Sequence, residues 1–188
     1  MTLKLITGPS ESITTAEAKL HLRVDSSDDD TLIAALITAA REQCEHELGR
    51  GIGSQTWQRT LDAFPANGIA LGMPPVASIT SVQYVDTAGT LQTLSSTLYT
   101  LDSASDDEAW VLPAEDTEWP ETLDTANAVR VQFSCGLTTV PSTVRAWMLL
   151  RIGTLYQHRG EIAAGISINA LPDQFSARLL DRYRVHAA

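Results

Sequence analysis

The sequence is poor in the features that mark secreted, membrane-spanning or disulfide-stabilised proteins. Its two cysteines, Cys44 and Cys135, lie far apart and form no C-x-x-C pair, so no disulfide framework is indicated. No apolar run approaches the roughly 18 residues that a membrane span needs, and the first residues show no signal-peptide pattern. We therefore expect a soluble protein with no membrane association, made in a cytoplasm with both thiols reduced.

Sequence motifs of catalysis are also missing. His46-Glu47 begins like the zinc-protease motif H-E-x-x-H, but Arg50 stands where the second histidine should be. There is no P-loop, no G-x-S-x-G and no G-x-G-x-x-G. Carboxylates are abundant, but pairs of them carry no specificity in a chain this acidic. We therefore predict no enzymatic activity, no catalytic residue, no metal ligand and no cofactor.

The charge of the chain is unevenly distributed around a net value of −10. Residues 86–124 hold ten acids and no Lys or Arg, whereas residues 145–184 hold six arginines against three acids. An acidic chain does not bind DNA by counterion release, so a nucleic-acid-binding role is disfavoured. The arginine-rich part either docks on an acidic partner or forms a solvated helix face.

Hydrophobic periodicity places helices in the first and last parts of the chain. Thr14 and Glu17 have the spacing of a capping box, and Asp28 to Asp30 suit the positive end of a helix dipole. Val140-Pro141 precedes another helical stripe, because proline suits the first turn of a helix. The predicted helices cover residues 14–22, 28–48, 141–160 and 173–183, with a weakly patterned linker at 160–171.

The middle of the chain, residues 55–134, has the pattern of short antiparallel strands. In the clearest case, Val129, Val131 and Phe133 alternate with Arg130 and Gln132. Acid-rich segments at 102–108 and 115–124 are expected to be exposed loops. The predicted fold is therefore α+β: one domain over residues 1–188, in which a small bundle of two N-terminal and two C-terminal helices carries an antiparallel β insert.

Several strings, in this order and spacing, resemble one family over roughly residues 13–185. They include Ala18-Lys19-Leu20-His21-Leu22-Arg23-Val24-Asp25, Gln55-Thr56-Trp57, Pro74-Pro75-Val76 with Ser78-Ile79, and Val129-x-Val131-x-Phe133 before Val140-Pro141. The pattern is similar to that of the tailed-phage head–tail connector (adaptor) family. Some members of that family are described only as uncharacterised phage proteins with a possible part in DNA packaging. A departure is Ser134-Cys135-Gly136, where a small residue is expected before the glycine and cysteine is small enough.

The resemblance implies a structural virion protein at the head–tail junction, synthesised in the cytoplasm of the bacterial host. Such connectors form a homo-oligomeric ring, usually twelvefold, below the portal protein. Double-stranded DNA passes through the ring without specific binding, and the next head-completion or tail protein docks on the far side. The alternatives are a neighbouring head-completion or tail-terminator protein, a DNA-packaging accessory factor, or an enzyme that lacks recognisable motifs.

Two groups of candidate functional residues follow from the resemblance and the charge pattern. The basic C-terminal segment suits docking into the portal, because a short basic amphipathic helix fits a partner's groove. Acids that face the channel would let DNA slide without sticking. The portal-docking candidates are Arg178, Arg182, Tyr183 and Arg184, and the channel-facing candidates are Asp102, Asp106, Asp107, Glu108, Glu115 and Asp116.

Overall fold

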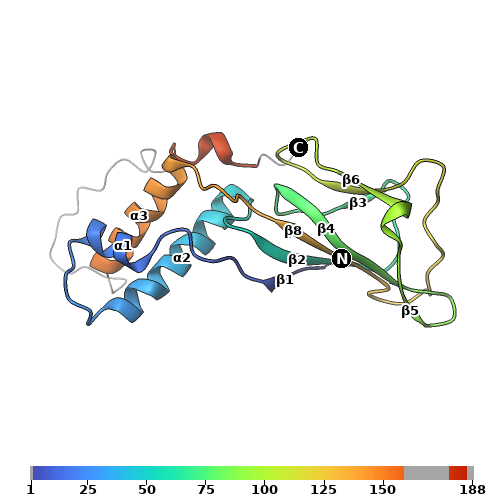
Figure 1. The fold of residues 1–188 in the computed structure, drawn as a ribbon, viewed down its shortest axis with the longest axis horizontal. Coiled ribbons are helices and arrows are strands. Elements are labelled where there is room, and N and C mark those ends of the chain that lie inside the picture. Colours follow the sequence, from blue (N-terminus) through green and yellow to red (C-terminus); the bar gives the residue numbers. More distant parts are fainter. Residues whose placement is uncertain (1, 159–177, 186–188) are drawn as a thin grey trace. The chain divides into compact units, whose positions relative to one another are not determined.

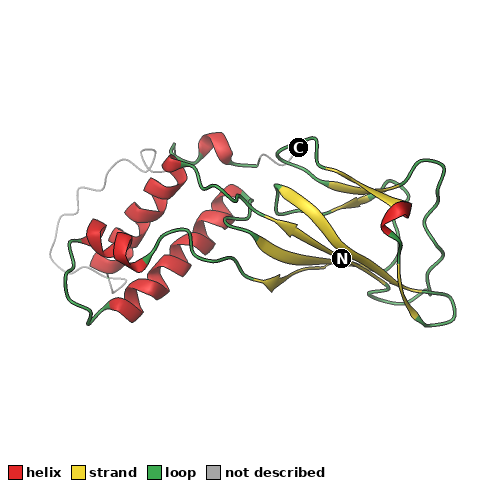
Figure 2. Cartoon of the chain, viewed as in Figure 1, coloured by secondary structure: helices red, strands yellow, loops and turns green. Residues whose placement is uncertain are grey.

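The chain forms two compact units in the computed structural model, which describes residues 2–158 and 178–185. The β unit combines Met1–Ser10 with Gly53–Thr138, and the helical unit combines Glu11–Ile52 with Thr139–Ala188. Each unit is therefore built from two stretches of sequence. The mixture of helices and antiparallel sheets confirms the predicted α+β class (Figures 1 and 2).

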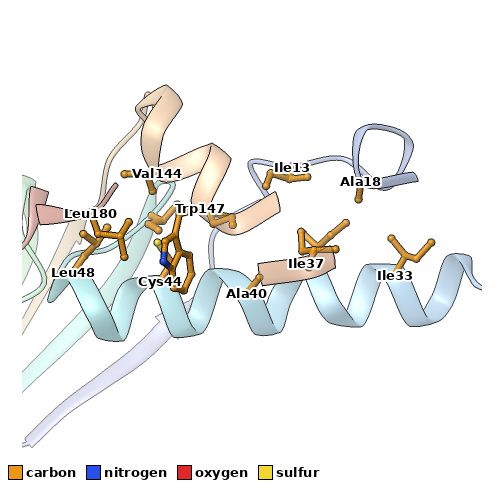
Figure 3. Close-up of a cluster of buried hydrophobic side chains, with 13 residues drawn as sticks. Ile13, Ala18, Ile33, Ile37, Ala40, Cys44, Leu48, Val144, Trp147 and Leu180 are labelled. Carbon is orange, nitrogen blue, oxygen red and sulfur yellow. The ribbon is translucent and has the colours of Figure 1, made fainter. Parts of the chain in front are cut away.

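In its described residues, the helical unit contains three α-helices: α1 (Thr15–Leu22), α2 (Asp30–Leu48) and α3 (Ser142–Gln157). The predicted apolar stripe of α2 faces its core, where Ile33, Ile37 and Cys44 are almost fully buried (Figure 3). Trp147 and Met148 of α3 belong to the same cluster. A buried Leu, Ile or Met side chain stabilises a fold by roughly 1.5–3 kcal/mol, so this stripe is the main reason α2 and α3 pack together.

The predicted capping box at the start of α1 forms only in part. The Glu17 backbone N–H donates to Thr14 Oγ1 at 3.2 Å, as a capping threonine should. The Glu17 carboxylate does not return to the cap. It accepts instead from Arg145 Nε of α3 at 2.8 Å. An ion pair between two helices has thus replaced the second half of the box.

A fourth α-helix of the expected bundle is not found among the described residues. Arg178–Leu180 form a turn and Asp181–Tyr183 a 3-10 helix, η2, while the start of the predicted helix and the linker before it lie outside the described residues. Arg50 Nε donates to the Tyr183 carbonyl at 2.5 Å, and the Val185 N–H donates to the Leu48 carbonyl at 2.8 Å. The backbone of this segment is therefore bonded to Leu48, the last residue of α2, and to Arg50 just after it.

The β unit contains a five-stranded antiparallel sheet. Its strands, in the order in which they neighbour one another, are β1 (Thr2–Thr7), β2 (Gln55–Leu61), β8 (Val129–Cys135), β4 (Val76–Val85) and β5 (Leu91–Thr93). Along β8 the predicted alternation is confirmed, since Val131 and Phe133 are fully buried and Arg130 is exposed. The sequence did not indicate β1, because this edge strand is exposed along most of its length and lacks a buried alternating face.

A second, three-stranded sheet in the order β3 (Ile69–Ala70), β7 (Trp110–Pro113) and β6 (Tyr99–Asp102) completes the β unit. Ile69 and Val111 from this sheet belong to one buried cluster with Val82, Val131 and Phe133 from the larger sheet. The hydrophobic core thus lies between two antiparallel sheets. The polar faces are left outside, where Gln132 Nε2 donates to Gln58 Oε1 at 3.2 Å.

Candidate interaction surfaces

The C-terminal candidate residues lie on a short segment that is held against its own helical unit. Leu180 is 1% exposed and belongs to the core (Figure 3). Tyr183 packs against that core. Arg184 binds Glu47 twice, with Nε donating to the carbonyl and Nη2 to the carboxylate, both at 3.0 Å. Tyr183 and Arg184 therefore position the segment on α2.

The other two basic candidates of this segment are exposed to solvent. Arg178 lies in the turn before Leu180, and Arg182 lies in η2 with its guanidinium carbon 5.8 Å from the centre of the Tyr183 ring. The structure thus divides the four sequence-predicted residues into an anchoring pair, Tyr183 and Arg184, and an outward pair, Arg178 and Arg182.

Arg50, which sequence reasoning treated only as a residue that breaks a zinc motif, anchors the same segment. Its side chain is buried, and its Nε supplies the donor for the Tyr183 carbonyl. A buried arginine is stable only when it is hydrogen-bonded. A signal was present in the sequence, because the carbonyls at the end of a helix need donors and Arg50 directly follows Gly49. No feature of the sequence indicated its partner, the Tyr183 carbonyl, which is 133 residues away.

The six channel-facing candidates lie around the three-stranded sheet of the β unit. Asp102 ends β6, Asp106 to Glu108 lie in the loop between β6 and β7, and Glu115 and Asp116 follow β7. All are exposed except Asp107, which is partly buried. Glu108 Oε2 accepts from the Trp110 indole at 3.3 Å, and Asp102 Oδ1 accepts from the Ala104 backbone at 3.2 Å. These two hydrogen bonds shape the loops. Of the six carboxylates, that of Asp102 lies on β6 and the other five lie in the loops before and after β7.

A buried polar network in the helical unit was not predicted as such. Arg41, 6% exposed, donates from Nη1 to Glu45 at 2.8 Å and from Nε to Glu11 at 3.1 Å. Glu45 Oε1 in turn accepts from the Ile52 backbone N–H at 2.8 Å. The network ties α2 to both ends of the segment Glu11–Ile52, so its charges hold the chain in place.

Cys44 has the properties of a core residue. Burial, followed by the nearby charges of Glu45 and Glu47, raises the pKa of its thiol to about 12. Since the thiolate is the nucleophile and the metal ligand, a thiol that stays protonated at neutral pH supplies neither function. Within residues 2–158 and 178–185 there is no group of three or more His, Cys, Asp or Glu side chains that could hold a metal ion. No helix in the same residues is long and apolar enough to cross a membrane.

These features define a mixed α+β protein whose charged residues either brace the fold or lie on open surfaces. Residues 12–79 match the model of the phage gp6-like head-tail connector protein family. That match confirms the resemblance to the head–tail connectors that the sequence indicated, over a region running from the start of the helical unit into β4.

Solved structures share the fold along the entire chain. A chain from the neck of an empty gene transfer agent (GTA) particle, computed with C6 symmetry, aligns with a TM-score of 0.80 and 22% identity, covering 100% of this chain and 97% of that chain. A chain from the virion of a native GTA particle aligns with a TM-score of 0.77 and 21% identity, with the same coverage. A chain from the neck of a native GTA particle computed with C12 symmetry aligns with a TM-score of 0.77 and 19% identity, again with the same coverage. No curated protein sequence matches the chain.

Proposed function

We propose that this chain is a structural protein of the virion neck, located at the head–tail junction, and that it has no enzymatic activity. The match of residues 12–79 to the head–tail connectors carries the proposal. The fold shared with chains from GTA particles, two of them from the neck, supports it. In this proposal the two units act together as one connector domain, made in the cytoplasm of the bacterial host without membrane association.

In the proposed assembly, the chain forms a homo-oligomeric ring below the portal, and the next neck or tail protein docks on its far side. Twelve copies are the expected number, in keeping with the C12 symmetry used for one neck structure of the same fold. A ring subunit needs two different lateral surfaces, because only head-to-tail contacts generate a closed ring of this kind. A tail-terminator or head-completion role is less well supported, since such proteins are built mainly of β structure and this chain has a three-helix unit.

The portal contact in this proposal is made by the outward pair, Arg178 and Arg182, while Tyr183 and Arg184 hold the segment on α2. Deletion of residues 172–188 is a poor test of this contact, because it would remove Leu180 from the core. Loss of a buried leucine side chain costs about 2–5 kcal/mol, so deletion would confuse lost binding with lost folding.

Reversal of the two exposed charges avoids that difficulty. The double variant Arg178→Glu/Arg182→Glu should bind the portal at least about tenfold more weakly in a pull-down titration, because charge pairs at an interface steer association. The control is Lys4→Glu/Arg130→Glu, which makes the same change of net charge at two exposed positions of the β unit. The portal-docking role would be contradicted if both variants lost binding to the same extent. It would also be contradicted if both bound the portal as tightly as the native chain.

The exposed acids of the β unit are proposed to face the DNA channel. Carboxylates release no counterions from DNA, so a wall that carries them lets the duplex pass without binding. In assembled necks, a structure that placed Asp102, Asp106 and Glu115 on the outer wall of the ring would remove this part of the proposal.

The main test is electron microscopy of lysates from a phage or prophage with a nonsense mutation in this gene. Tailless heads accompanied by free tails are the expected result, because the joint between them is missing. Normal tailed particles would refute the neck function and return attention to a DNA-packaging accessory role.

A further inference from the structure

Leu20 is the most exposed large apolar side chain of the described chain. It lies on α1 and is 81% exposed, whereas Ala18 two residues earlier is fully buried. In the described part of the helical unit, Leu150 of α3, at 37%, is the other exposed large apolar side chain. A single exposed leucine is ordinary, but here the two come with complementary surroundings.

The surroundings of Leu150 form a small hollow on α3. Among the described residues its lining is Trp147, Leu150, Arg151 and Thr154, and its volume is about 100 Å³. The spacing i, i+3, i+4, i+7 is that of four residues bordering one hole on a helix surface, the type of hole that receives a side-chain knob from a facing helix. The hollow is roughly three times the ~30 Å³ share of one water molecule, which is enough for a branched aliphatic side chain.

One carboxylate beside the knob is opposite in sign to the charge of the hollow. Leu20 borders an open groove of about 400 Å³ whose lining includes Lys19, Asp25 and Asp30. Lys19 Nζ binds Asp30 Oδ1 at 2.7 Å, so Asp25 is the lining carboxylate that this ion pair does not use. The hollow carries Arg151, whose Nε donates to Gln43 Oε1 at 2.6 Å. A guanidinium has five N–H donors, so Arg151 can hold Gln43 and still meet a carboxylate of a facing surface.

We propose that Leu20 of one copy inserts into the Trp147–Leu150–Arg151–Thr154 hollow of the next copy, with Asp25 beside Arg151. This inference rests on the proposed ring and names its lateral contact. Knob and hollow lie on different helices, and the residues that line the hollow include none from α1. Each copy therefore offers one of each, and the contact is head-to-tail, as ring closure requires.

Cross-linking of mixed single-cysteine variants tests the geometry. Full-length Leu20→Cys and Leu150→Cys chains, each with a different tag, are concentrated together and treated with a short bismaleimide. Native Cys44 and Cys135 are both buried and stay out of the reaction. A cross-link that needs both variants supports the proposal. Its absence, or its formation by Leu20→Cys chains alone, overturns it, because the latter would mean a two-fold contact.

Sedimentation of a knob variant tests the energetics. Leu20→Lys should weaken self-association roughly ten- to a hundredfold, the range expected for loss of one buried leucine contact. Its thermal unfolding should not change, since the side chain is exposed in the single chain. The control is Leu98→Lys, an exposed leucine of the β unit at 39%, which should associate like the native chain.

The two proposals fail in different ways. Necks that assemble normally from Leu20→Lys chains would overturn this contact and leave the neck function standing. Normal tailed particles without the gene would refute the neck function, while a cross-link that needs both cysteine variants would still support this contact between copies.

Discussion

At the scale of single residues, most charged side chains near a core serve the fold. Arg41, Arg50 and Arg184 are each bonded to acids or carbonyls of their own unit. Arg145 bridges Glu17 and the Ser12 carbonyl in the same way. A count of arginines in the sequence therefore overstates the basic surface, and in the described C-terminal segment Arg178 and Arg182 are the arginines that are exposed to solvent.

Asp86 organises the turn between β4 and β5, and its contribution to stability should depend on pH. Its Oδ1 accepts from the backbone N–H groups of Ala88 and Thr90, and its Oδ2 accepts from Gln92 Nε2 at 2.8 Å. These hydrogen bonds, that of Gln92 first, lower the pKa of the Asp86 carboxyl. A lowered folded-state pKa stabilises the fold fully above the unfolded value of about 3.9, and the benefit is lost as pH falls through the folded value.

The variant Asp86→Asn should therefore be less stable than the native chain at neutral pH, and the difference should shrink as the solution is acidified. Chemical denaturation at several pH values, followed by circular dichroism, measures this. The control is Asp116→Asn, which removes an exposed carboxylate outside this turn. A difference that is constant from neutral to strongly acidic pH would contradict the role assigned to the carboxylate.

At the scale of secondary-structure elements, long periodic segments were easy to predict and short exposed ones were not. The nineteen-residue α2 buries a continuous stripe, and the pattern of such a stripe is visible in the sequence. The edge strand β1 has almost no buried side chain, and its pairing with β2 depends on residues about 50 to 58 positions away. In the described C-terminal segment, the Tyr183 carbonyl accepts from the Arg50 side chain and the Val185 N–H donates to the Leu48 carbonyl, and local periodicity shows neither bond.

Gly68 controls the entry into β3 and gives a prediction at this scale. Its φ is +90°, and a Cβ there would meet the Leu112 side chain and lie 3.0 Å from the Val111 carbonyl oxygen. The variant Gly68→Ala should therefore lower the free energy of unfolding by about 1–3 kcal/mol or more, since steric overlap adds to backbone strain.

Gly89 is the matched control for Gly68. Its φ is +81°, and nothing lies within 4 Å of a Cβ at that position, so Gly89→Ala has the strain without the overlap. Urea denaturation should rank the native chain, Gly89→Ala and Gly68→Ala in decreasing order of stability. Equal stability of the two variants would show that the approach of Gly68 to β7 does not matter.

At the scale of the whole molecule, charge is divided between the units. Eleven acids against Lys4, Arg59 and Arg130 give the β unit −8 of the chain's −10 formal charge. The helical unit is close to neutral, with most of the arginines and the exposed pair Leu20 and Leu150. This division is consistent with the proposals that the helical unit makes the contacts between copies and that the β unit faces DNA without binding it.

The purified chain should not retain double-stranded DNA in a filter-binding assay, even at low salt, because an acidic surface gains nothing from counterion release. Tight, salt-sensitive retention of DNA by the native chain would contradict passage without binding and favour a packaging factor.

The sequence by itself determined the α+β class, the helix of the α2 region, the alternation of β8 and the resemblance to the connectors. These features depend on local periodicity and on the order of short sequence strings. Both can be seen in the amino-acid sequence alone. Only the tertiary structure decided which charges are internal and where Leu20 and the α3 hollow lie. The physical reason is that burial and pairing are set by residues distant in sequence, as when Arg50 and Tyr183 meet across 133 positions.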